Sequence, residues 1–214
     1  MRNADVKELG HILIHPYDGF ESMSYHKRGS PLLSFIIISC FFLFTLFERH
    51  SLAFRFNYYS AENTNVFMVF ISTFFLVCIA VVANWALHAV IDFEAILYGK
   101  AAPRMIWIVF GYSLFPYVMG ILARTLLSHL CTYEDATFLS IMMAGCAIWS
   151  GLILWFGMLQ VQEYSAGKNL ACMIGTVIGM MLIMFLCFLL ILLFKELFAF
   201  IASIVNEIMI RTGI

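Results

Sequence analysis

An otherwise apolar stretch, VANWALHAVIDFE, contains three polar side chains that are capable of hydrogen bonding, proton transfer or metal binding. Asn84, His88 and Asp92 recur every four residues, which places all three on one face of a helix. Such a stripe can be a structural hydrogen-bond seam, a path for a solute or protons, or a metal site. We favour the structural seam, because a single short stripe with no second charged helix facing it is a weak basis for a conduit, and no HExxH or similar motif supports a metal site. No metal ligand is assigned.

A second polar group, Tyr112, Ser113 and Pro116, lies within YSLFPY. Proline has no N–H, so the backbone carbonyl of Tyr112 loses its helical partner. In lipid that carbonyl must be satisfied by a hydroxyl, a water or another helix. We therefore expect a broken helix at the centre of a helical bundle. The Asn84 stripe should turn toward it, because polar side chains in membranes face the bundle interior.

The elements that carry these residues are predicted from the distribution of charge. Hydrophobic residues make up 63% of the chain and charged residues 12%, far from the proportions of soluble proteins. All charged residues fall outside five windows, 29–47, 66–91, 105–123, 136–162 and 169–194. The hydrocarbon core of a bilayer needs about 20 apolar residues per helix. The chain is therefore predicted to be an all-α integral membrane protein.

The prediction is a bundle of five transmembrane helices in a membrane domain, 31–194, with no separate soluble domain. Its helices are expected at 31–47, 66–91, 105–127, 136–160 and 169–194. Gly175 and Gly179 form a GxxxG motif in the last of them, which favours close packing on a neighbouring helix. No nucleophile–base set, nucleotide loop or carboxylate pair is present. No catalytic residue or cofactor is therefore predicted, and no basic block suggests nucleic acid.

The two ends of the chain are predicted to be amphipathic. Residues 1–30 are too polar to cross a membrane and are expected to form a collar in the headgroup layer. Residues 195–214 form an amphipathic tail that either prolongs the last span or lies flat on the surface. Lys27 and Arg28 directly precede the first span, which indicates a cytoplasmic N-terminus in the cell membrane. Five crossings then put the C-terminus outside.

Several short motifs resemble one known family. They are HPYDGFESMSYHKRGS at 15–30, YGK before the third span, YSLFPY within it, YSAGK before the fifth span, and the ending FIASIVNEIMIR. In order and spacing they resemble the Yip-domain family (Ypt-interacting proteins), and the ending resembles tails of its Gram-positive bacterial branch. The resemblance implies a five-helix bundle with a cytoplasmic N-terminus. No catalytic residues are established for the family.

The resemblance also bears on partners. Eukaryotic relatives bind small GTPases in vesicle trafficking, a role that is not carried over to a chain with so short an N-terminus. Bacterial relatives are often encoded beside carbohydrate transporter components. We expect a non-enzymatic membrane protein in contact with the lipid bilayer and other membrane proteins, such as an accessory or scaffold subunit bound to ABC transporter permease subunits. The alternative is a small channel or transporter using the Asn84 stripe, and a membrane-embedded enzyme comes third.

Overall fold

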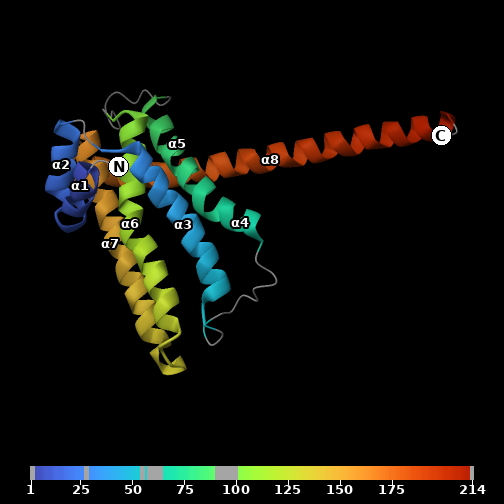
Figure 1. The fold of residues 1–214 in the computed structure, drawn as a ribbon. Coiled ribbons are helices and arrows are strands. Elements are labelled where there is room, and N and C mark those ends of the chain that lie inside the picture. The colour runs from blue at the N-terminus through green and yellow to red at the C-terminus, as the bar shows by residue number, and fades with distance from the viewer. Residues whose placement is uncertain (1–2, 27–28, 54–55, 57–64, 90–100, 213–214) are drawn as a thin grey trace.

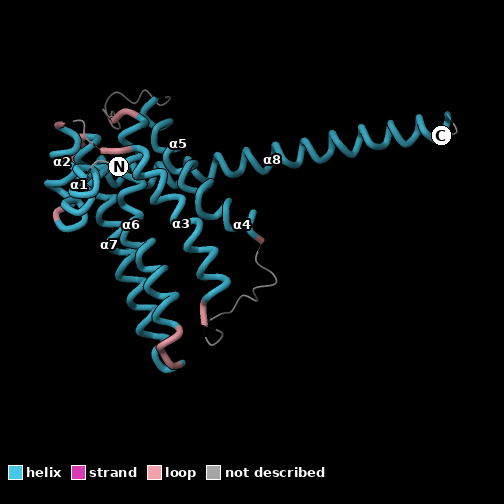
Figure 2. The backbone as a smooth tube through the Cα atoms, viewed as in Figure 1, coloured by secondary structure: helices cyan, strands magenta, loops and turns pink. Residues whose placement is uncertain are grey.

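The computed structural model describes residues 3–26, 29–53, 56, 65–89 and 101–212, and it contains no strand within them (Figures 1 and 2). Its α-helices are α1 (Asn3–Ile14), α2 (Pro16–Tyr25), α3 (Pro31–Ser51), α4 (Val66–Phe70), α5 (Leu76–Ala89), α6 (Pro103–Ser128), α7 (Ala136–Gln162) and α8 (Ala166–Thr212). A π-helical turn, Ile71–Phe75, joins α4 to α5. Four of these helices, α3, α6, α7 and α8, are long and apolar enough to span a membrane, and so is the continuous stretch that α4, the π turn and α5 form together. The predicted all-α membrane bundle is therefore confirmed.

Proline and capping residues set where several helices begin. Pro16, Pro31 and Pro103 each occupy the first helical positions, where the missing N–H costs nothing. Before α3, the Ser30 hydroxyl accepts a hydrogen bond from the Leu33 N–H at 3.3 Å. Before α4, the Asn65 side chain accepts one from the Phe67 N–H at 3.0 Å. Local sequence therefore determines these starts.

The centre of the bundle is α6, which packs against both α3 and α7. In the most apolar 18-residue stretch of α6, 56% of the residues are buried, whereas the buried share of the corresponding stretch is 22% in α3 and 11% in α7. Gly111 allows α3 to come close, because a Cβ at this position would lie 2.7 Å from the Ser34 Cα. The Ser34 hydroxyl then reaches the Ile108 carbonyl of α6 at 3.4 Å.

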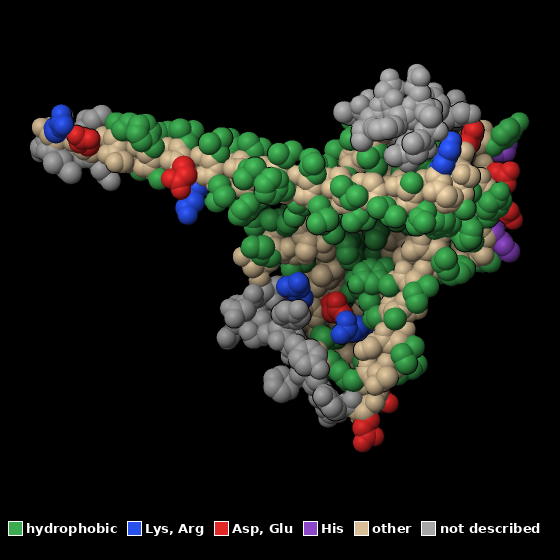
Figure 3. Space-filling view, turned by 180° about the vertical axis from the view of Figure 1, so that it is seen from behind, with side chains coloured by type: hydrophobic (Ala, Val, Ile, Leu, Met, Phe, Trp, Pro, Cys, Tyr) green, Lys and Arg blue, Asp and Glu red, His purple; other side chains and the backbone are tan. Residues whose placement is uncertain are grey.

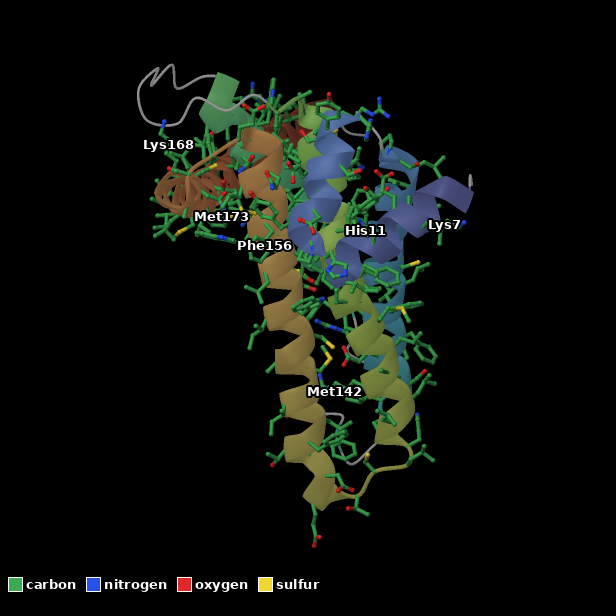
Figure 4. All side chains as sticks on the ribbon, turned by 90° about the vertical axis from the view of Figure 1, so that its left-hand side faces the viewer. Lys7, His11, Met142, Phe156, Lys168 and Met173 are labelled. Carbon is green, nitrogen blue, oxygen red and sulfur yellow. The ribbon has the colours of Figure 1, made fainter. Side chains whose placement is uncertain are left out.

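The first two helices form a hairpin that packs on α7 through α2. Ile12, Phe20 and Met23 are fully buried, and Phe20 fills the space that Gly157 leaves on α7. In Figure 4, His11 of α1 and Phe156 of α7 lie at a similar height. The hairpin is therefore part of the packed bundle, with Phe20 against α7 and Ile12 against Gly19 of α2.

The last helix, α8, is 47 residues long, about 70 Å at 1.5 Å per residue. Its first turns pack on α5, and the rest extends away from the bundle, across the direction of α6 and α7 (Figure 1). Residues 195–212 of the predicted tail continue α8 without interruption. Figure 3 shows apolar side chains along most of this extension, interrupted by a few charges.

Candidate functional site

The proline in α6 does not break the helix. We expected an interruption at Pro116, and this was wrong: α6 continues from Pro103 to Ser128 with Pro116 inside it. Directly after the proline, the Tyr117 N–H donates a hydrogen bond of 3.0 Å to the Ser150 hydroxyl of α7. The neighbouring helix thus supplies a partner beside the proline, which is how such residues are tolerated in membranes. A shallow groove of about 260 Å³, lined by Ser113, Tyr117 and Ser150 among others, lies here.

Tyr112 and Ser113 both belong to the core of α6. Tyr112 is fully buried, and its hydroxyl oxygen accepts a hydrogen bond of 3.0 Å from the Ser30 N–H. This bond joins the start of α3 to the middle of α6. The Ser113 hydroxyl donates to the Phe110 carbonyl within α6 at 2.9 Å. The two residues therefore have structural partners inside the bundle.

Asn84 faces α8 and not α6, unlike the orientation expected from the stripe. Its fully buried side chain donates hydrogen bonds to the Thr176 hydroxyl at 2.8 Å and the Cys172 sulfur at 3.4 Å. The seam therefore does not join Asn84 to the Tyr112–Pro116 stretch. His88 belongs to α5, but its side chain lies outside the described residues, as does all of Asp92.

Small residues explain why α5 pairs with α8. A Cβ at Gly175 would lie 3.2 Å from Leu87 Cδ1, and one at Gly179 would lie 3.3 Å from Ala83 Cβ. Both glycines of the GxxxG motif therefore face α5 and permit a close helix contact. This contact is what brings Asn84 to the polar residues of α8.

Two further residues, Tyr164 and Asn169, complete what we call the α5–α8 junction, which consists of Asn84, Tyr164, Asn169, Cys172 and Thr176. Asn169 is fully buried and donates to the Trp155 carbonyl at 3.0 Å. Tyr164 hydrogen-bonds with the Cys172 thiol, and burial raises the pKa of Tyr164 above its ordinary value. The sequence analysis missed Asn169 and Thr176, although with Cys172 they fall at i, i+3 and i+7 on one face of α8.

The junction contains hydrogen-bonding groups with spare capacity. The side-chain oxygens of Asn84 and Asn169 are buried without a hydrogen-bond partner. Among the residues that the structure describes, no group of three or more His, Cys, Asp or Glu is placed to hold a metal ion. These two oxygens can therefore accept hydrogen bonds from a small polar ligand. The five side chains of the junction are all neutral.

At the opposite end of the bundle, polar contacts join α3 to α6. Arg124 forms an ion pair of 3.0 Å with Glu48. The Ser128 hydroxyl accepts from the Ala53 N–H at 3.1 Å, and the His129 ring nitrogen Nε2 lies 2.7 Å from the Ser51 carbonyl oxygen. These contacts hold the ends of two long helices together.

Comparison with known proteins gives one match. A family model described as the Yip1 domain matches residues 10–189, which include every described residue of α2 to α7 and the packed start of α8. No curated protein and no solved structure matches the chain.

Proposed function

Because the chain belongs to the Yip1 domain family, we propose that this multi-pass membrane protein is a non-enzymatic accessory or scaffold subunit of a carbohydrate transport complex. It works through contacts with other membrane proteins, and ABC transporter permease subunits are the partners that we propose. The ending FIASIVNEIMIR supports a place in the Gram-positive bacterial branch of the family.

The observation that carries this proposal is the apolar surface of α8. Its membrane-competent part, Ala166–Val205, has 40 residues, and none of its most apolar window is buried. At 1.5 Å per residue this length is about 60 Å, twice the roughly 30 Å of a hydrocarbon core. A helix of this length does not fit within the hydrocarbon core along the membrane normal, and α8 extends across the direction of α6 and α7, which leaves most of its apolar surface outside the bundle. This apolar surface favours a protein partner.

A second surface on α7 supports the same proposal. Ala144, Ala147 and Gly151 are exposed and follow one another at helical spacing. A Cβ at Gly145 or Gly151 would meet nothing within 4 Å. Small outward residues allow a transmembrane helix of another protein to approach closely.

A photo-crosslinking amino acid at Leu190 tests the proposal. Leu190 is 52% exposed on α8. In membranes of the native host, we expect adducts with permease subunits, identified by mass spectrometry. The matched control is the same amino acid at Ile153, which is fully buried on α7 and should give adducts only within the chain. Adducts at Leu190 with lipid or with copies of this chain alone would contradict the proposal.

The proposal also includes an orientation in the cell membrane, with the N-terminus in the cytoplasm and the C-terminus outside. Lys27 and Arg28 support it through the excess of basic residues in cytoplasmic loops. Reporter fusions at residue 1 and after Ile214 should report opposite sides. Signals from the same side would mean an even number of crossings.

A small channel or transporter is the second candidate, favoured by the unpartnered oxygens of Asn84 and Asn169. If the junction is a conduit, the purified chain in liposomes should carry a solute or proton flux by itself. Asn84→Ala and His88→Ala should then abolish that flux while leaving the fold intact, with only a modest loss of thermal stability. Under the scaffold proposal, liposomes containing the chain show no flux above empty ones.

A further inference from the structure

A cavity of about 390 Å³ lies between the end of α2, the start of α6 and the end of α7. Ser24, Arg104 and Glu163 supply its polar lining, and Met105 and Val161 supply apolar lining. Val161 is buried, whereas Arg104 and Glu163 are exposed. The cavity therefore combines a cation, a carboxylate and a hydroxyl with an apolar side.

The position of this cavity along the helices follows from the charge pattern. Arg104 is the last charged residue before the uncharged run 105–123, and Glu163 is the first one after the uncharged run 136–162. The two helices are antiparallel neighbours, so both boundaries lie at the same end of the bundle. In a membrane this boundary is the level of the lipid headgroups.

Arg104 can bind a phosphate group at this level. Its guanidinium donates one hydrogen bond to the Gly29 carbonyl, at 3.4 Å. A guanidinium has five N–H donors, so others remain for phosphate oxygens, which arginine binds in a charge-assisted manner. Ser24 supplies a hydroxyl in the same cavity.

Glu163 adds the opposite charge, and its backbone is unusual. It has a φ of 57°, the only positive φ among the described residues other than glycine. Glycine is favoured at the end of a helix in this conformation, so a side chain there carries a conformational cost. Such an outlier is a reason to look for a function of the side chain. Glu163 already takes part in an interaction within the protein, but an ionised carboxylate has two oxygens with about four acceptor sites. It can therefore also accept hydrogen bonds from a positively charged group of the ligand.

We propose that this cavity binds the phosphoethanolamine headgroup of a membrane lipid, with the phosphate at Arg104 and the ammonium at Glu163. The acyl chains then run along the apolar surfaces of α6 and α7. An ammonium donates three hydrogen bonds, whereas the trimethylammonium of choline donates none, and glycerol carries no positive charge. Phosphatidylethanolamine is therefore preferred over phosphatidylcholine and phosphatidylglycerol.

The test is binding of each lipid to the purified, delipidated full chain in detergent, followed by native mass spectrometry and thermal unfolding. Phosphatidylethanolamine should bind most tightly and raise the melting temperature most, and inorganic phosphate should have no effect. Arg104→Gln should weaken phosphatidylethanolamine binding by about tenfold or more, the scale of a lost charge-assisted hydrogen bond. Arg104→Lys should retain part of the binding, which keeps the test valid if Arg104→Gln does not fold.

Glu163→Gln distinguishes the headgroups. It should remove the preference for phosphatidylethanolamine over phosphatidylglycerol while leaving binding of both. The matched control is Arg211→Gln at the exposed tip of α8, where the arginine pairs with Glu207, and this variant should bind like the wild type. Equal binding of all three lipids by the wild type, unchanged binding by Arg104→Gln, or stabilisation by inorganic phosphate equal to that by lipid would overturn the proposal.

Discussion

The indole nitrogen of Trp149 donates a hydrogen bond of 3.2 Å to the carbonyl oxygen of Leu13, joining two residues 136 positions apart. Trp149 lies 13 residues before the end of α7, or about 20 Å along the helix. Leu13 is in the last turn of α1, where carbonyl oxygens have no partner within the helix. Trp149 thus fastens the turn of the N-terminal hairpin to the middle of α7.

Trp149→Phe removes this donor and keeps most of the ring. We expect a loss of about 1 kcal/mol in the free energy that holds the hairpin to α7, the usual contribution of one hydrogen bond. Hydrogen exchange in α1 should become faster, and the amides of α6 should be unaffected. Ile148→Val, at the exposed neighbouring position, is the control and should leave exchange in α1 unchanged. Equal exchange in α1 for wild type and Trp149→Phe would show that the bond does not hold the hairpin.

Gly111→Ala should destabilise the bundle at the contact between α3 and α6. The added Cβ would lie 2.7 Å from the Ser34 Cα, which is backbone and cannot rotate away. We expect a loss of about 1–3 kcal/mol, the range for overpacked sites. It is measured as thermal unfolding in detergent.

Gly145→Ala on α7 is the matched control, because a Cβ there meets nothing within 4 Å. It should be neutral or slightly stabilising, since alanine favours helix more than glycine does. If the two variants melt alike, the close approach of α3 at Gly111 is not required for folding.

Ser150→Ala should lower stability by about 0.6 kcal/mol, and up to roughly 2, the range for hydrogen bonds between membrane helices. The variant leaves the Tyr117 N–H without its partner on α7. In a Pro116→Ala background, Ser150→Ala should lower stability by less, because without the proline ring α6 can form its regular i→i−4 backbone hydrogen bonds in this turn. A double-mutant cycle by thermal unfolding measures the coupling. Additive effects would mean that Ser150 does not compensate for the proline.

Gly179→Leu should loosen the start of α8 from α5. The leucine side chain has no room beside Ala83, which already lies 3.3 Å from the position of a Cβ. Crosslinking between cysteines placed at Leu87 and Gly175, which face each other in the wild type, should fall in this variant. Gly167→Leu is the control, because a Cβ at Gly167 has open space around it. Undiminished crosslinking in Gly179→Leu would contradict packing through this motif.

The five spans could be predicted from the sequence because hydropathy and charge are local properties. A long uncharged run such as 136–162 must form a helix in lipid, where every backbone group needs a partner within its own segment. The start at Pro31 was likewise predicted, because proline and capping residues act within one turn. The third span was expected from residue 105, and α6 begins two residues earlier at Pro103. The motifs at 15–30 and 112–117 pointed to the family that the match over 10–189 shows.

Tertiary structure decided which helix faces meet. Asn84 was placed on the correct element, but its partners Cys172 and Thr176 came from α8 and not from the helix of Pro116. In a membrane protein, lipid and neighbouring helices are equally apolar. The spacing of apolar residues along a helix therefore does not indicate which face packs against another helix. The packed face depends on the fit of small residues, such as Gly175 and Gly179 against Leu87 and Ala83, which exists only once two helices are placed together. For the same reason the hairpin contact between Leu13 and Trp149 appears only in the folded chain.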